Sequence, residues 1–550
     1  EYPALSPVGA TGLGDHRFDS LLDEVDAAAR AREGAFVDRY LTALDGIDRA
    51  LLSREHQVDY ALLRHRLEAS RWRLEIFQEW AWNPLEYTGL SGGALYGLMA
   101  REFAPVAERL RSATARMEQF PRLFAQVREA IVPARVPKIH AETAVKQNRG
   151  VLSIIDQMIL PEAGALPDDE RARLTQAAET ARAAIEEHQQ WLEEALLPQA
   201  AGEWRIGEEL YDQKLFFSLH TPMTRQEIRK RAERQMREVR ERMYVYAKEA
   251  YAQRHPYTAF PKRPDEAYRR AVIRAGLEMA CEDLAPPEGV VDAARHSLEL
   301  ATDFVREKDL VALPPDPLEI IVMPEFQRGV ALAYCDSPGP LDAGQRTFYA
   351  VSPPPAEWTP EQVHSHLREY NLRSIHNLTL HEAVPGHYLQ LAQANRYPGT
   401  LRALLGSGTF IEGWAVYSEW MMNEAGFLDG DPLMRLTTLK WLLRATANAI
   451  IDQGVHTGGM TEEEAMRLMV EDAFQEEREA AGKWVRAQLT SAQLSTYFVG
   501  QQEHLALRDA VEQAWGESFD LKRYHDAILA YGSPPVKFVR ALILEEAIPE

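Results

Sequence analysis

The sequence predicts a mainly α-helical protein with one small β-sheet. Along most of residues 18–310, apolar residues recur at three- and four-residue spacing, which is the period of an amphipathic helix. Three short runs rich in β-branched and aromatic residues follow, between proline clusters at 312–317 and 351–360. Helical spacing then resumes and continues to the end of the chain.

Each region supports this fold class in turn. RFDSLLDEVDAAARAREGAFVDRYLTAL, RARLTQAAETARAAIEEHQQWLEEALL and TRQEIRKRAERQMREVRERMYVYAKEAY have the helical period but lack sustained heptads. LEIIVMP, VALAYCDS and RTFYAVS are separated by Gly, Pro and Asp, which favours an antiparallel meander. We expect residues 1–310 to form helical cleft walls. Residues 311–550 would hold the sheet, the helices that directly follow it and the C-terminal helices, all in one continuous structural unit.

Composition excludes several classes of function. Hydrophobic residues make up 46% and charged residues 26% of the chain, as in ordinary soluble proteins. The formal net charge of −22 argues against binding to nucleic acid, and no apolar run is long enough to span a membrane. Cys281 and Cys335 are too few for a disulfide framework, which fits a reduced compartment. We therefore expect a cytoplasmic location, although a removed signal peptide would also fit. The oligomeric state stays open.

The segment IHNLTLHEAVPGHYLQ, residues 375–390, carries the strongest chemical signal. Two imidazoles at i and i+4 of a helix can share one ion. His381 and His387 are six residues apart, which in a regular helix separates them by about 120° and roughly 9 Å. Pro385 removes a helical hydrogen bond, and Gly386 adds backbone freedom. We therefore expect the helix to loop out near residue 385 and to return His387 to the register of an i+4 ligand.

A zinc site needs a third protein ligand and a position for water. TFIEGWAVYSEWMMNEAG predicts a helix from about Ile411, with Glu412 in its first turn and Glu419 on the same face. We expect Glu412 to complete a site for one Zn²⁺ per chain and Glu419 to orient a ligand histidine. Glu382, beside a ligand, would act as general base. His376 is a rival ligand, but a packed or ligand-orienting role suits it better.

A polar stripe on the helix predicted from STYFVGQQEHLALRDA is a second candidate. Either a solvated face or the lining of a cleft fits it. As cleft lining, Tyr497 or His504 would donate to the oxyanion of a substrate, and Arg508 would bind a substrate carboxylate. Tyr531 and Arg540, in the tail YHDAILAYGSPPVKFVRALI, are further candidates for substrate binding. In the sheet, an edge strand would either be covered or add an extended peptide as a further strand.

Several motifs of this sequence occur together in a known protein family. HEAVPGHYLQ, EGWAVYSE, YFVGQQEHLALR and FDLKRYHDAILAYGSPPV resemble the bacterial DUF885 family, and the opening GLGDHRFD and the AYCDSPG and FYAVSPP segments fit it too. That family in turn resembles gluzincin metallopeptidases of the thimet-oligopeptidase, angiotensin-converting-enzyme and thermostable-carboxypeptidase type. Those have a His-Glu-x-x-His motif, whereas this chain has two residues more.

The resemblance carries expectations about fold and site. It implies a mostly helical fold with a deep cleft and a small sheet whose edge strand binds the peptide backbone. It also implies His381, His387 and Glu412 as zinc ligands, with Glu382 as the base.

The expected function is zinc-dependent hydrolysis of a C–N bond, as in a metallopeptidase that cleaves short peptides. A metal-activated water would attack the carbonyl while Glu382 carries the proton. Two alternatives stay open. One is an amidase or esterase for a non-peptide substrate. The other is a degenerate scaffold that binds peptide without cleaving it, because the Pro-Gly insertion prevents chelation. The expected partner is a short peptide or small amide, with no nucleic acid and no membrane.

Overall fold

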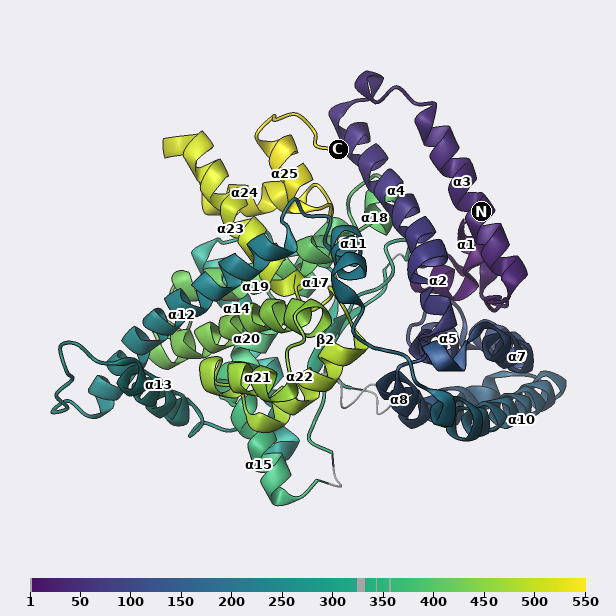
Figure 1. Cartoon of the computed structure of the whole chain (residues 1–550), viewed down its shortest axis with the longest axis horizontal. Coiled ribbons are helices and arrows are strands. Elements are labelled where there is room, and N and C mark those ends of the chain that lie inside the picture. The colour runs from purple at the N-terminus through teal and green to yellow at the C-terminus, as the bar shows by residue number, and fades with distance from the viewer. Residues whose placement is uncertain (1, 324–331, 343, 356–357) are drawn as a thin grey trace. The chain divides into compact units, whose positions relative to one another are not determined.

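The computed structural model describes residues 2–323, 332–342, 344–355 and 358–550. Helices dominate these ranges, as predicted (Figure 1). The described residues form two compact units. The first contains residues up to Trp204 together with the segment Pro338–Arg346, and the second contains the other described residues from Arg205 onward. Within the described ranges, no helix combines the length and apolar character needed to cross a bilayer.

The first unit is helical. Its core joins α5, α6, α7 and α10 through buried apolar side chains such as Leu95, Phe120, Phe124 and Ile185. Its α-helices are α1 (Tyr2–Leu5), α2 (Pro7–Gly12), α3 (Ala27–Asp45), α4 (Arg54–Trp72), α5 (Pro84–Met99), α6 (Val106–Met117), α7 (Phe120–Ala130), α8 (Lys138–Asn148), α9 (Gly150–Ile154) and α10 (Asp168–Trp191).

The second unit is larger and contains every residue predicted for the site. Its α-helices are α11 (Gly207–Leu219), α12 (Arg225–Arg254), α13 (Glu266–Ala280), α14 (Val290–Lys308), α15 (Pro360–Glu369), α16 (Leu372–Glu382), α17 (His387–Ala394), α18 (Thr400–Leu404), α19 (Gly408–Glu424), α20 (Pro432–Thr457), α21 (Glu462–Arg467), α22 (Glu477–Leu489), α23 (Thr496–Trp515), α24 (Leu521–Leu529) and α25 (Val536–Ile543).

Helix α20 lies at the centre of the second unit. Its residues between Thr437 and His456 are nearly all buried, because α12, α16, α19, α22 and α23 all contact it. Gln235 of α12 donates to Thr446 of α20 over 3.0 Å. The helices from α11 to α14 therefore belong to the core of the C-terminal half. For this reason the units divide near residue 204, whereas the sequence suggested a division near 310 within one continuous unit.

The sheet of the second unit packs against the helix that carries the His-Glu pair. Tyr349 and Ile320 of the sheet share a core with Ile375 and Leu378 of α16. The Tyr349 hydroxyl also lies 3.2 Å from the Thr379 hydroxyl. The predicted position of the sheet, just before this helix in sequence, thus places it directly on the helix in space.

The sheet is mixed, which corrects the prediction of an antiparallel meander. Its order is β1–β3–β2, with β3 parallel to β1 and antiparallel to β2. The strands are β1 (Leu318–Val322), β2 (Ala333–Asp336) and β3 (Thr347–Val351). β3 is the most buried strand and takes the central position, where both of its edges find hydrogen bonds. Of the residues quoted for the strands, Pro324, Val330 and Ala331 lie outside the described ranges.

Candidate metal centre

The helix predicted to carry both histidines is interrupted at the Pro-Gly pair. α16 ends at Glu382 and α17 begins at His387, so the predicted break is confirmed. Gly386 passes so close to the preceding turn that a Cβ atom there would lie 1.9 Å from the carbonyl oxygen of His381. Only glycine fits this approach, because any side chain would overlap backbone.

The break lets the two imidazoles meet. The ring centroids of His381 and His387 lie 4.7 Å apart, and their planes are inclined by 86°. The loop between the helices is held by α19, since the Trp414 indole donates to the Pro385 carbonyl over 2.8 Å. An uninterrupted helix would have separated the two rings by roughly 9 Å along its axis.

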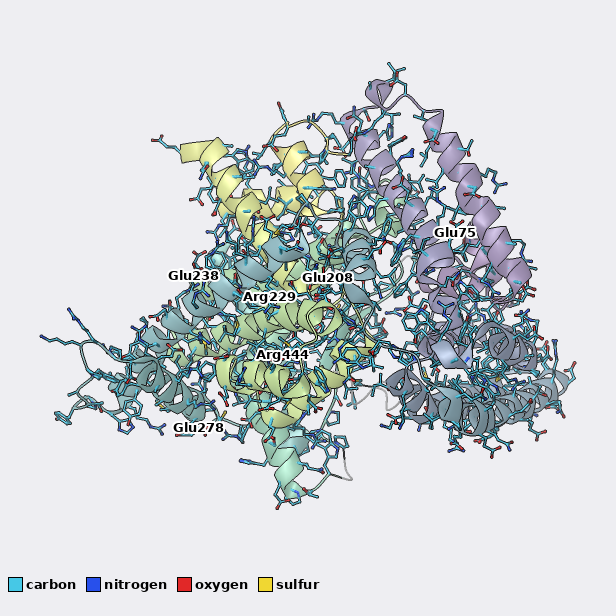
Figure 2. The ribbon with its side chains drawn as sticks, viewed as in Figure 1. Glu75, Glu208, Arg229, Glu238, Glu278 and Arg444 are labelled. Carbon is cyan, nitrogen blue, oxygen red and sulfur yellow. The ribbon has the colours of Figure 1, made fainter. Side chains whose placement is uncertain are left out.

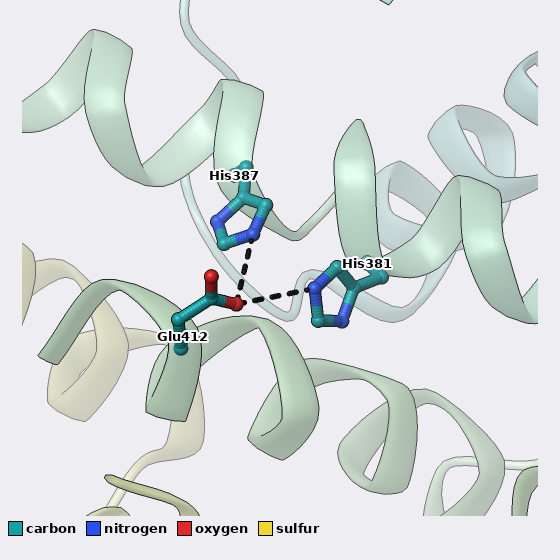
Figure 3. Close-up of side chains that lie close together, drawn as sticks. All are labelled: His381, His387 and Glu412. Atoms are coloured by element: carbon teal, nitrogen blue, oxygen red, sulfur yellow. Dashed lines mark ion pairs between the residues drawn. The ribbon is translucent and has the colours of Figure 1, made fainter. Parts of the chain in front are cut away.

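Glu412 completes a triad with these histidines (Figure 3). It lies on α19, which begins three residues earlier than predicted. Its Oε2 atom lies 3.5 Å from Nε2 of His381 and 3.4 Å from Nε2 of His387. Among the described residues, these three form the group of His, Cys, Asp and Glu side chains that can hold a metal ion.

The spacing of the triad suits a zinc ion. Ligands about 2.0–2.1 Å from a tetrahedral ion lie roughly 3.3 Å from each other, whereas a charge-assisted hydrogen bond is about 2.7–2.9 Å long. The Glu412 Oε2 atom is also buried without a hydrogen-bond partner. A buried carboxylate oxygen in that position is costly unless a cation satisfies it. The donor set of two imidazoles and one carboxylate therefore fits Zn²⁺.

Charge holds the triad together. Burial by itself lowers the pKa of His381, but the nearby carboxylates of Glu412 and Glu419 outweigh it and raise this pKa well above its usual range. Burial likewise raises the pKa of Glu412, but the two histidines outweigh it and hold this pKa far below its usual range. A divalent cation binds such a set by displacing the imidazole protons.

A line of buried polar groups orients His381, as predicted for Glu419. The His381 Nδ1 atom donates to Oε1 of Glu419 over 2.7 Å, which turns Nε2 toward Glu412. The other Glu419 oxygen accepts from Asn377 over 2.6 Å. The Asn377 oxygen in turn accepts from Thr438 of α20 over 2.7 Å.

Replacement of Glu419 by glutamine is expected to weaken zinc binding about 10- to 100-fold. The neutral amide loses the charge-assisted bond to His381, and it cannot accept from both His381 and Asn377 without placing its own NH₂ against a donor. Competition with a chelator of known affinity measures the change. Glu424→Gln is the matched control, because Glu424 lies on the same helix and pairs with Arg508. Equal zinc affinity in the two variants would contradict the orienting role.

Glu382 is held beside the triad by the sheet. Its Oε2 atom accepts from the backbone N–H of Cys335 in β2 over 3.0 Å, and the residue is buried. Burial raises the pKa of Glu382, although His381 and His387 pull it down. A carboxylate with a raised pKa next to metal ligands is suited to accept and release a proton.

Three further predicted residues lie in different settings. His376 lies apart from the triad, since its Nδ1 atom lies 2.8 Å from the Ser297 hydroxyl. His504 is fully buried, and its Nε2 donates to the Phe410 carbonyl over 3.0 Å. The His504 side chain is therefore not placed to donate to a substrate oxyanion. Tyr497 is half-buried, and its hydroxyl accepts from Arg486 over 3.2 Å.

The two arginines predicted to bind substrate are paired with carboxylates of this protein. Arg508 donates to Glu424 over 2.7 Å and lies over the Trp420 ring. Arg540 makes a two-pronged pair with Glu546 at the surface, at 3.0 and 2.7 Å. Both guanidinium groups thus already have carboxylate partners. The Tyr531 carbonyl accepts from Arg402 over 3.5 Å.

Two features of the site were not predicted. Asn377 precedes His381 by four residues, so the helical period alone could have placed it on the ligand face. The Cys335 N–H is a backbone group, and no sequence signal marks which backbone donor will meet Glu382. Neither Cys335 nor Cys281 is in a disulfide.

Comparison with known proteins agrees with this arrangement of motifs. Residues 7–543 match the family described as "Bacterial protein of unknown function (DUF885)". The chain belongs to the DUF885 family. No curated protein matches the DUF885 chain.

Two solved structures resemble the DUF885 chain along nearly its whole length. One is titled a "putative lipoprotein of unknown function" from Shewanella oneidensis, with 35% identity, a TM-score of 0.82, and coverage of 99% of this chain and 97% of that one. The other is titled a "putative lipoprotein" from Colwellia psychrerythraea, with 17% identity, a TM-score of 0.79, and coverage of 98% and 95%. At that lower identity, the second shows likeness of fold only.

Proposed function

We propose that this protein is a zinc-dependent hydrolase, and specifically a metallopeptidase that cleaves short peptides. The observation that carries the proposal is the spacing of the triad, with Glu412 Oε2 at 3.5 and 3.4 Å from the two imidazole nitrogens. The expected resemblance to the gluzincin peptidases, whose His-Glu motif is two residues shorter, motivates the same proposal. A deep cleft for the peptide, as in those enzymes, stays a prediction.

Each residue of the site has a distinct task in this proposal. His381, His387 and Glu412 would hold Zn²⁺, which when bound lowers the pKa of a water and polarises a carbonyl oxygen. Glu382 takes a proton from the attacking water and passes it to the leaving amine. The Cys335 N–H occupies one oxygen of Glu382, which fixes the orientation of the carboxylate and leaves its other oxygen for this transfer.

Tyr497 remains the candidate donor to the substrate oxyanion. It lies on α23, three residues before Gly500, which is about 4.5 Å along a helix. A Cβ atom at Gly500 would lie 2.6 Å from the Cα of Gly413, the neighbour of Glu412. α23 therefore crosses α19 beside the triad, one turn from Tyr497.

Two alternative functions were open from the sequence: a degenerate peptide-binding scaffold, and an amidase or esterase for a non-peptide substrate. The degenerate scaffold was suggested by the longer His-Glu motif, and the closeness of the two imidazoles counts against it. An amidase or esterase with a non-peptide substrate would use the same groups. A comparison of dipeptides with small amides and esters as substrates separates that alternative from a peptidase.

Metal removal provides the direct test of this proposal. We expect purified protein to contain close to one zinc per chain, measured by elemental analysis. Chelation should abolish hydrolysis and lower the melting temperature, and added zinc should restore both. Zinc at a hundred times its Kd would stabilise the fold by about 2.7 kcal/mol. A folded, metal-free protein whose melting temperature does not change when zinc is added would refute the proposal.

The comparisons give the expected cytoplasmic location no support. Both solved relatives are titled as putative lipoproteins. We therefore propose that this protein acts outside the cytoplasm rather than within it.

A further inference from the structure

Lys483 is a buried basic residue that pairs with no carboxylate among the described residues. It lies on the inner face of α22 and is only 5% exposed. Among the described residues, it makes neither a hydrogen bond nor an ion pair. A largely buried ammonium group without a direct ion pair is costly, so such a residue is rarely kept for stability alone.

The carboxylates around Lys483 are already committed to other cations. Glu369 accepts from Lys440 over 2.7 Å. Glu479 pairs with Arg444, which is labelled in Figure 2, and accepts from the Tyr370 hydroxyl over 3.2 Å. These carboxylates leave Lys483 without a matched negative charge.

Arg486, one turn further along the same helix, also pairs with no carboxylate in the part of the chain that the structure describes. Arg486 donates to Gln493 over 2.9 Å and to the Tyr497 hydroxyl over 3.2 Å, both of which are neutral. Burial and the nearby charges of Arg444 and Arg486 hold the pKa of Lys483 well below its usual range. The protein as a whole carries a net charge of −22, so this local excess of positive charge runs against its composition.

The two cations are connected to the candidate metal centre through Tyr497. Arg486 contacts the Tyr497 hydroxyl, and Tyr497 lies one helical turn from Gly500, where α23 crosses α19 next to Glu412. All of these residues belong to the second unit. Tyr497 thus links Arg486 to the pair of helices that carries Glu412.

We propose that Lys483 and Arg486 bind the C-terminal carboxylate of a short peptide substrate. The inference rests on the proposed peptidase function. A C-terminal carboxylate is favoured over an acidic side chain because every unmodified peptide carries it. A peptide extends by about 3.3–3.6 Å per residue, and we expect this anchor to direct cleavage to a bond near the C-terminus. Arg508, the carboxylate partner expected from the sequence, is instead paired with Glu424.

The kinetic test compares tri- to pentapeptides of alanine, each with a free C-terminal carboxylate and as its amide. Wild-type protein should prefer the free acids by about 10- to 100-fold in kcat/KM, mainly through KM, as expected for loss of charge-assisted hydrogen bonds. Lys483→Met and Arg486→Gln should remove that preference and leave the amides nearly unaffected, while Arg486→Lys should retain part of it. Lys522→Met is the control, since Lys522 pairs with Asp309 at the surface.

The melting temperature of the Lys483→Met variant distinguishes a ligand-binding lysine from one that only stabilises the fold. Because methionine fills similar space without a charge, Lys483→Met should raise the melting temperature of the peptide-free protein by roughly 2–5 °C. A lower melting temperature would identify Lys483 as a structural residue and overturn the proposal.

Equilibrium binding separates the two proposals. The same peptides are titrated by calorimetry into Glu382→Gln protein, alone and combined with Lys483→Met. Tighter binding of acids than of amides that disappears with Lys483→Met supports the carboxylate site, even if wild-type protein cleaves none of the peptides and the peptidase proposal fails. Equal binding of acids and amides, or binding of neither, overturns the carboxylate site. Preference only for peptides with acidic side chains would also overturn it.

Discussion

Replacement of Glu382 by glutamine is expected to reduce peptide hydrolysis by about a thousand-fold or more while zinc remains bound. General acid–base catalysis contributes about 10²- to 10⁴-fold to such reactions, and glutamine cannot carry the proton. The ligands His381, His387 and Glu412 do not depend on this carboxylate for their contacts. Hydrolysis is measured with short peptides, and bound zinc by elemental analysis of the same sample.

The control for this variant is Glu424→Gln, which removes a carboxylate far along α19 from Glu412. It should leave both hydrolysis and zinc content near wild-type values. If Glu382→Gln retained turnover, another group would have to move the proton. If the variant lost zinc, Glu382 would be needed to hold the metal ligands in place. The loss of hydrolysis would then not identify Glu382 as the general base.

Replacement of Gly386 by alanine should disrupt the metal centre without touching a ligand side chain. The new Cβ atom would lie 1.9 Å from the His381 carbonyl oxygen and 2.4 Å from that of Leu380. Backbone atoms cannot rotate away as a flexible side chain would, so the break between α16 and α17 must open. We expect a loss of about 3 kcal/mol or more in stability. Zinc affinity should fall at least roughly 100-fold, because His387 leaves its position.

Gly482→Ala is the matched control for this change. Gly482 lies within α22, and a Cβ atom there would meet nothing within 4 Å. Alanine should be neutral or slightly stabilising at that position, since glycine is unfavourable inside a helix. Thermal unfolding and chelator competition on both variants measure the effect. Normal zinc affinity in Gly386→Ala would mean that the imidazoles meet without the close approach at residue 386.

The candidate site shows how far local sequence rules reach. The unusual six-residue spacing of His381 and His387 was resolved by the chemistry of Pro385 and Gly386, because a helix break is decided by adjacent residues. Glu412 and Glu419 were found by the helical period of one segment. Both inferences depend only on residues a few positions apart, so the sequence was sufficient for them.

Partners from distant segments were harder to predict. Arg508 and Arg540 have the chemistry to bind a substrate carboxylate, but they pair with Glu424 and Glu546. His504 has the chemistry of an oxyanion donor, but it is buried against Phe410. Which of several chemically equivalent groups remains unpaired is decided by packing, and Lys483 was therefore not recognised from the sequence.

The sequence by itself determined the helical class, the small sheet before the His-Glu helix, and the three side chains that we propose as metal ligands. Helical periodicity and turn chemistry are local, so they can be recognised in a single chain. The tertiary structure decided the strand order β1–β3–β2, the Cys335 N–H on Glu382, and the absence of a counterion for Lys483 among the described residues. Those features depend on contacts between segments far apart in the chain, where many pairings satisfy the same local rules and only the packed core selects one.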